Sequence, residues 1–277
     1  MENKKNFKNK IIIGTVHFGM PYGLKQSKDA FTSNKEIKKI LTVARNNNIL
    51  TLDTARNYGI AEKKLGNCGV NDFKITSKIY IDKNVTDLKK YIYSQIEMIL
   101  SNLKVGTLHS LLVHNPSTLL DKHGKQIYNH LLNAKKIYKI KKIGISAHDF
   151  CEIKPIINNY KIEIIQLPFN LFDQRILKNK LLDELKYNKI EIHARSIFLQ
   201  GLLLFSIKEF PEQFLQWKHL FKKFDSFVKN YNISKLEACI SYVNSFNEID
   251  KFVIGIKNSM ELEKIASINL KKIDQFP

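Results

Sequence analysis

The 277-residue sequence has few of the features that mark secreted, membrane-spanning or zinc-binding proteins. Its cysteines, Cys68, Cys151 and Cys239, are far apart and form no CxxC pair, which argues against a disulfide framework or a zinc cluster. No apolar run reaches the ~18 residues of a membrane-spanning helix. The apolar stretch after the basic start is too short and too broken by glycine for a signal peptide. We therefore expect a soluble, cytoplasmic protein with no membrane partner.

Arginine is also scarce, although the chain is strongly basic. Lysine and arginine together number 45 against 26 acidic residues, a net charge of +19, yet the arginines are only Arg45, Arg56, Arg175 and Arg195. Such a charge first suggests nucleic acid, because basic chains bind polyphosphates by releasing counterions. However, the lysines are spread over every segment, with no compact run beyond residues 1–10. Arginine, the residue that most often hydrogen-bonds bases and phosphates in nucleic-acid complexes, is scarce. We expect no nucleic-acid partner.

Short apolar runs alternate with helical patterns along the chain. The runs cover residues 11–16, 49–53, 73–79, 108–114, 142–146, 162–169, 190–196 and 251–256. Their continuous hydrophobicity is typical of strands buried on both faces of a parallel sheet. Apolar residues at three- and four-residue steps predict helices over 33–47, 86–103, 124–139, 149–158, 174–187 and 258–268. The segment 207–247 is long enough for two helices, with Ser234 capping the second.

Eight strands, each followed by helix, fit a closed barrel better than an open sheet. An open nucleotide-binding sheet would need a GxGxxG turn after its first strand, and GTVHFGMPYG does not have that spacing. The sequence therefore predicts an α/β fold, a single (β/α)8 TIM barrel over residues 1–277. We expect a flexible basic N-terminus at residues 1–10 and an extended helical segment between strands seven and eight.

Four titratable side chains follow three neighbouring strands of this barrel. Asp53 ends the second strand and leads to Tyr58, Lys78 ends the third, and His114 ends the fourth. Active sites of such barrels lie at the carboxyl ends of the strands. A free tyrosine has a pKa near 10, and a neighbouring ammonium ion favours its phenolate form. Lys78 held by Asp53 would supply that ion while Tyr58 donates a proton to a carbonyl oxygen oriented by His114.

The elements LDTARNYG, ITSKI and LLVHNP, in this order, resemble the aldo-keto reductase superfamily. The resemblance implies a (β/α)8 barrel that reduces carbonyls with NADPH through an Asp-Tyr-Lys-His tetrad, here Asp53, Tyr58, Lys78 and His114. It covers nearly the whole chain. The segments GTVHFGMPYG and RSIFLQGLLL further resemble a bacterial branch found near surface-polysaccharide genes, which suggests carbohydrate metabolism.

The resemblance also implies contacts to the cofactor. Gly14 and Thr15 match the family's backbone contact to the nicotinamide ribose, and Ser146 and Gln166 match residues that hold the carboxamide. Arg195 stands where the family usually stacks an aromatic ring on the nicotinamide, and Ala147 replaces a usual asparagine. After the last strand, the implied contacts to the 2′-phosphate and the adenine are Lys257, Asn258 and Glu261.

Substrate contacts are expected from the loops at the barrel rim. The candidates are His17, Tyr22, Arg56 and Arg175. Two of them are arginines in a lysine-rich chain, and arginine grips carboxylate or phosphate through a two-pronged fork. They suggest an anionic or polyhydroxyl substrate such as a sugar or sugar-nucleotide derivative. No metal site is expected, since His109 and His114 are an odd step apart on one strand.

Three functions remain open at this stage. The leading hypothesis is NADPH-dependent reduction of an aldehyde or ketone with Tyr58 as general acid. A second is an enzyme that uses bound NADP(H) transiently for sugar epimerisation or elimination. A third is a non-catalytic NADPH-binding partner subunit. We expect a small-molecule carbonyl substrate and a monomer or weak homo-oligomer.

Overall fold

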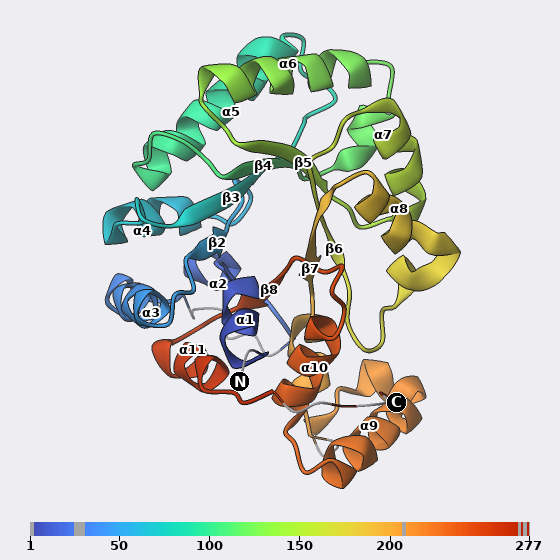
Figure 1. The fold of residues 1–277 in the computed structure, drawn as a ribbon. Coiled ribbons are helices and arrows are strands. Elements are labelled where there is room, and N and C mark those ends of the chain that lie inside the picture. Colours follow the sequence, from blue (N-terminus) through green and yellow to red (C-terminus); the bar gives the residue numbers. More distant parts are fainter. Residues whose placement is uncertain (1–2, 25–30, 207–208, 271–272, 274–275, 277) are drawn as a thin grey trace.

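The computed structural model describes residues 3–24, 31–206, 209–270, 273 and 276. Within these residues, parallel strands close into a barrel in the order β1 to β8, each paired with the next and β8 paired with β1 (Figure 1). The strands are β1 (Ile11–Gly14), β2 (Thr51–Asp53), β3 (Lys74–Ile79), β4 (Ser110–Val113), β5 (Lys142–Ser146), β6 (Ile164–Pro168), β7 (Glu191–Arg195) and β8 (Lys251–Gly255). The predicted (β/α)8 barrel is confirmed.

Helices surround the barrel in the positions that the sequence predicts. The main ones are α3 (Asn34–Asn46), α5 (Leu88–Leu103), α6 (Gly124–Ile137), α7 (Ile153–Asn159), α8 (Leu181–Tyr187) and α11 (Ser259–Ala266). Short 3-10 helices precede some of them or follow strands: η1 (Pro116–Leu119), η2 (Phe150–Glu152) and η3 (Arg175–Lys180). The side chains of Ser33 and Asp87 cap α3 and α5 by accepting hydrogen bonds from backbone N–H groups. Helices α2 (Val16–Gly19) and α4 (Ala61–Cys68) were not predicted.

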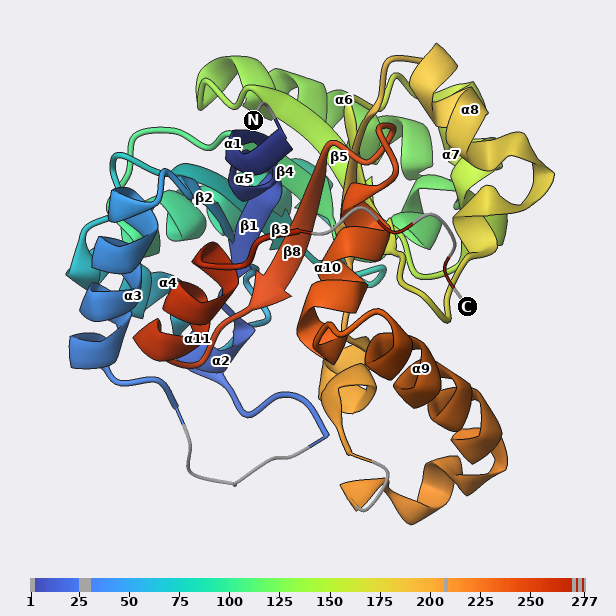
Figure 2. The same cartoon turned by 60° about the horizontal axis from the view of Figure 1, so that its bottom comes forward.

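The basic N-terminal segment contains a helix that the sequence did not predict. Residues 3–10 form helix α1 (Asn3–Lys10), whose Phe7 is buried. The ammonium group of Lys251 on β8 donates to the backbone oxygen of Asn9 at 2.8 Å. Figure 2 shows α1 at the end of the barrel opposite the arrowhead of β8. The segment therefore packs against the amino-terminal ends of the strands.

The segment between β7 and β8 is helical, as predicted. It contains η4 (Leu199–Leu204), η6 (Glu212–Trp217), α9 (Lys218–Asn230) and α10 (Lys235–Asn244), while residues 207 and 208 lie outside the described residues. Ser234 caps α10 in a capping box with Glu237. Trp217 is 43% exposed, whereas Phe221 and Phe224 are buried. Figure 2 shows α9 projecting at the end of the barrel where β8 terminates.

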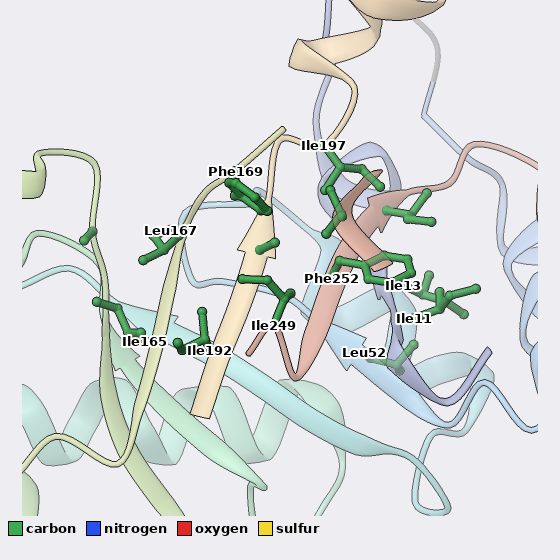
Figure 3. Packing of buried hydrophobic residues seen from close by; sticks show 14 of the residues in the cluster. Ile11, Ile13, Leu52, Ile165, Leu167, Phe169, Ile192, Ile197, Ile249 and Phe252 are labelled. Atoms are coloured by element: carbon green, nitrogen blue, oxygen red, sulfur yellow. The ribbon is translucent and has the colours of Figure 1, made fainter. Parts of the chain in front are cut away.

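Strand side chains alternate between the helices and the barrel interior. Ile13 of β1 lies in register with Leu52 of β2, and both belong, with Ile165 of β6, to the buried apolar cluster (Figure 3). Successive strand residues point to opposite faces. Polar groups occupy the interior, where the hydroxyls of Thr76 and Ser110 are 2.7 Å apart. Asp53, the neighbour of Leu52, therefore points inward at the carboxyl end of β2.

Candidate active site

A cavity of about 750 Å³ opens at the carboxyl ends of the strands. Most of the predicted site residues line it: Gly14, Thr15, His17, Tyr22, Asp53, Tyr58, His114, Ser146, Gln166, Arg195, Lys257 and Glu261. Lys78 lies directly behind this wall and is almost completely buried. Asn258, Arg56 and Arg175 are not among the lining residues.

A buried ion pair stands at the centre of the site. Lys78 Nζ donates to Asp53 Oδ1 at 2.5 Å, to the backbone oxygen of Thr54 at 3.0 Å and to the hydroxyl of Tyr58 at 3.4 Å. Burial lowers the pKa of Lys78, but the charges of Asp53 and Tyr58 outweigh burial, so the net pKa is raised. The ammonium ion is therefore charged at neutral pH and directed at the phenol.

The loop that carries Tyr58 is held in place by a close backbone approach. Gly59 has a positive φ of 57°, and a Cβ there would lie 2.4 Å from the backbone oxygen of Gly19. A Cβ at Gly19 would in turn lie 1.9 Å from the backbone oxygen of Tyr58. Only glycine fits both positions, because no side chain can enter this contact. Helix α2 thereby fixes the start of the loop from which Tyr58 reaches the cavity.

His114 completes the group and is neutral in this environment. Its ring lies edge-on to that of Tyr58, with centroids 6.2 Å apart. Burial, with a further contribution from the charge of Lys78, lowers the pKa of His114 to about 4. Its buried Nδ1 atom has no hydrogen-bond partner among the described residues. A neutral imidazole has one donor and one acceptor nitrogen, so His114 can hydrogen-bond a carbonyl oxygen without carrying a charge.

Gln166 and Asp53 are in direct contact, which the sequence did not predict. Gln166 Nε2 donates to Asp53 Oδ2 at 2.7 Å. Both carboxylate oxygens of Asp53 are therefore occupied, one by Lys78 and the other by Gln166. Ser146 is buried beside Gln166 in the strand register and also lines the cavity. The two residues matched to the family's carboxamide site are thus adjacent, and one of them also orients the carboxylate.

At the other end of the cavity, the start of α11 provides positive charge. Lys257, Glu261 and Lys264 line this end. Glu261 accepts a hydrogen bond from the backbone N–H of Lys257 at 2.8 Å. Asn258, predicted to contact a phosphate, caps α11 by accepting from the backbone N–H of Glu261 at 2.9 Å. Its side-chain oxygen is therefore bonded within the protein.

Two of the predicted substrate contacts lie in the cavity wall. His17 and Tyr22 line it with their rings 5.8 Å apart at the centroids, edge to face. Burial, followed by the charge of Lys257, lowers the pKa of His17 to about 4. These neutral, partly apolar groups form the rim beside the first strand.

The structure places the two predicted rim arginines elsewhere. Arg56 binds the buried carboxylate of Glu62 at 2.9 Å, and Glu62 also accepts from the hydroxyl of Ser77. Arg56 thus links the Tyr58 loop to β3. Arg175 binds Asp173 through two hydrogen bonds of 2.8 and 2.7 Å and is half exposed. The carboxylates satisfy both guanidinium groups, so neither arginine contributes to the cavity in this structure.

Several lining residues were not identified from the sequence. His148, in the loop after β5, accepts a hydrogen bond at Nδ1 from Arg195 at 2.8 Å. The segment between β7 and β8 contributes most of the others: Ser196, Ile197, Phe198, Gln200, Gly201, Leu204, Phe205, Ser234, Lys235 and Leu236. The sequence predicted an extended helical segment here. No spacing in the sequence indicated which of its residues reach the cavity.

The buried histidines predict a loss of stability in acid. Burial lowers the pKa values of His17, His109 and His114 to about 4 each, below the ~6.5 of an unfolded chain. The unfolded state therefore binds protons first, so stability is complete above about pH 6.5 and falls as the pH drops toward 4. Between pH 7 and 5 each of these histidines therefore lowers the free energy of unfolding. Urea unfolding at both pH values measures the change.

A substitution outside the cavity controls for this effect. His109→Asn removes one of the three groups, so the stability difference between pH 7 and 5 should shrink by about a third. His123→Asn, at an exposed position, should leave the difference unchanged. If the stability difference between pH 7 and 5 is the same in the wild type and in His109→Asn, His109 does not have the lowered pKa inferred here.

Neither a metal cluster nor a membrane-spanning helix occurs among the described residues. No group of three or more His, Cys, Asp and Glu side chains there is arranged to hold a metal ion. None of the helices described combines the length and apolarity needed to cross a membrane.

Comparison with known proteins identifies the family. The model of the aldo/keto reductase family matches residues 10–276. Two solved structures share the fold: PA4992 of Pseudomonas aeruginosa, described as an aldo-keto reductase, and the holo form of the aldo-keto reductase AKR11C1 of Bacillus halodurans. The first has a TM-score of 0.68 at 18% identity, covering 93% of this chain and 88% of its own. The second has a TM-score of 0.74 at 16% identity, covering 93% and 85%.

No curated protein matches the sequence significantly. The family assignment therefore depends on the family model, which spans almost the whole barrel. The chain belongs to the aldo/keto reductase family.

Proposed function

We propose that the protein reduces an aldehyde or ketone with NADPH and that Tyr58 donates the proton. Family membership implies an oxidoreductase that acts on a small carbonyl compound. The observation that carries the proposal is the chain of contacts from Asp53 through Lys78 to the hydroxyl of Tyr58, in the cavity wall beside His114. No purely structural role requires a phenol, an ammonium ion and an imidazole to meet at one cavity.

The cavity suits a dinucleotide cofactor. Its lining also includes Ser146 and Gln166 at the carboxyl ends of β5 and β6, Lys257 just before α11 and Lys264 in the last turn of α11. Amide and hydroxyl groups at the first end match a carboxamide, and the lysines at the second end match phosphate. We assign Gly14 and Thr15 to the wall between these ends, and Glu261 to the second end beside Lys257. NADPH, when bound, supplies the hydride that reduces the carbonyl carbon.

The side chains of this protein donate the proton and stabilise the group that loses it. Tyr58 transfers its phenolic proton to the carbonyl oxygen, so that hydride and proton together convert the carbonyl to an alcohol. The ammonium group of Lys78 stabilises the phenolate that remains, and Asp53 holds Lys78 in place. His114, neutral at physiological pH, orients the oxygen. His17 and Tyr22 contact the rest of the substrate from the rim.

Oxidation of NADPH by the purified protein tests this function. We expect absorbance at the dihydronicotinamide band to fall when aldehydes, ketoses or keto-sugar nucleotides are added, and the reduced product to form in equal amount. A parallel reaction contains only catalytic amounts of cofactor. Conversion of a sugar under that condition would instead support an enzyme that uses NADP(H) transiently. Cofactor binding without oxidation by any carbonyl would support a non-catalytic subunit.

A further inference from the structure

Arg195 differs from every other arginine of this chain in its partners. Each of the others is bound to a carboxylate: Arg45 to Asp72 at 2.7 Å, Arg56 to Glu62 at 2.9 Å and Arg175 to Asp173 at 2.7 Å. Within the described residues, Arg195 bonds only to neutral groups. It donates to the backbone oxygen of Ala147 at 3.0 Å, to His148 Nδ1 at 2.8 Å and to Ser196 Oγ at 3.3 Å.

The charge of Arg195 is partly buried and is not neutralised. Its Nε atom is inaccessible to solvent and has no hydrogen-bond partner among the described residues. Burial lowers the pKa of Arg195, although Tyr58, Tyr22 and Asp53 oppose this effect. An unpaired charge in such a position destabilises a protein unless an anion compensates it. The neighbouring carboxylates do not do so fully, because Asp53 is bound by Lys78 and Gln166 and Asp173 is bound by Arg175.

The position of this charge is next to the proposed proton donor. Arg195 lines the same cavity as Tyr58, His114 and His148. A guanidinium group has five N–H donors, and three are used, which leaves one on Nη1 besides the buried Nε. His148 accepts at Nδ1, so in its neutral form the proton is on Nε2, a second donor. Donors and charge together form a site for an anion.

We propose that Arg195, assisted by His148, binds a carboxylate that the substrate carries near its carbonyl group. This inference rests on the proposed reductase function and names the substrate class: aldehydes or ketones that are also carboxylic acids. The arginines at the rim, Arg56 and Arg175, do not take this role, because their charges are already paired. Arg195 lies in the cavity wall, where an anionic ligand would neutralise its positive charge.

Matched substrates test the proposal. The first pair is 4-oxobutanoate and its methyl ester, and the second is D-glucuronate and D-glucuronamide; in each pair the reacting aldehyde is the same and a neutral group replaces the carboxylate. We expect the wild type to favour the carboxylate by about tenfold to a hundredfold in kcat/KM, the range of one charge-assisted hydrogen bond. Arg195→Gln should bring the ratio close to one, mainly through KM, and Arg195→Lys should retain part of it.

Two controls separate this role from others. Arg45→Gln removes the same charge from the exposed pair with Asp72 and should leave the ratio unchanged. Because the sequence also places Arg195 beside the nicotinamide, the Kd for NADPH is measured for both proteins by quenching of protein fluorescence, and the substrate pairs are then compared at saturating NADPH, where Arg195→Gln should slow the carboxylates selectively. Weakened NADPH binding, with both members of each pair slowed equally, would show that Arg195 serves the cofactor and would overturn the proposal.

A binding measurement tests the role of Arg195 without requiring that the protein reduce a carbonyl. Calorimetric titration with 4-hydroxybutanoate, the carboxylated product, should detect binding to the wild type with NADP+ present and at least tenfold weaker binding to Arg195→Gln. Equal binding to both proteins, or no preference for the acids in the wild type, would overturn the inference. Failure of every carbonyl to oxidise NADPH would instead refute the reductase function, and the titration would still decide the role of Arg195.

Discussion

Replacing Tyr58 with phenylalanine is expected to lower kcat by about 10²–10⁴-fold, the usual contribution of a positioned general acid. The variant loses only the hydroxyl to which Lys78 Nζ points from 3.4 Å. Without it, the carbonyl oxygen has no adjacent proton donor, while the ring still packs beside His114. Steady-state kinetics with the best substrate of the carbonyl panel measures the loss.

Two observations decide how that loss is interpreted. NADPH should bind to Tyr58→Phe with nearly the wild-type Kd. The substitution does not alter Lys257 or Lys264, the lysines proposed to bind its phosphates. Tyr187→Phe removes a hydroxyl at a position that is 88% exposed and should leave kcat unchanged. If Tyr58→Phe keeps more than about a tenth of the wild-type kcat, Tyr58 is not the principal proton donor.

The second large effect is expected from Asp53→Asn. Lys78 and Asp53 are almost completely buried and 2.5 Å apart. Removing one charge of a buried pair leaves the other without compensation and typically costs about 3–5 kcal/mol. The asparagine also cannot accept from both Lys78 and Gln166 as the carboxylate does. Urea unfolding should show this destabilisation, and kcat should fall because the ammonium group is no longer held at Tyr58.

A double substitution distinguishes stability from catalysis. Asp53→Asn combined with Lys78→Met removes both charges, so it should be more stable than Asp53→Asn alone and still inactive. The exposed pair of Arg45 and Asp72 provides the comparison, since Asp72→Asn should cost less than about 1 kcal/mol. A destabilisation by Asp53→Asn as small as that of Asp72→Asn would contradict the buried-pair argument.

Much of the barrel could be predicted from local patterns. Strands such as β4 and β5 are apolar on both faces and are separated by helices with a clear apolar stripe, so their order and direction follow from sequence. Apart from β5, the predicted strands were longer than those observed, and α1, α2 and α4 were not predicted. These short helices have few residues with which to show a periodic pattern, and contacts such as that of Gly19 with the Tyr58 loop determine where α2 lies.

Whether a predicted site residue lies at the cavity depends on how its side chain is positioned. Asp53, Lys78 and His114 lie on or directly after strands, where backbone direction alone aims a side chain at the cavity. Arg56, Arg175 and Asn258 lie in loops or at a helix start, where a nearby partner decides the direction of a flexible side chain. In this structure those partners are Glu62, Asp173 and the backbone of α11.

The sequence by itself thus determined the barrel, the family resemblance and the chemical identity of the four proposed catalytic groups, because all of these depend on periodicity and on residues at strand ends. Only the tertiary structure decided which charges are paired. Gln166 meets Asp53 across 113 positions of sequence, and Arg195 meets Ala147 across 48. Such pairings arise when the barrel closes and brings distant strands together. For that reason the small number of arginines did not reveal, before the fold was known, that Arg195 alone among them lacks a carboxylate partner within the described residues.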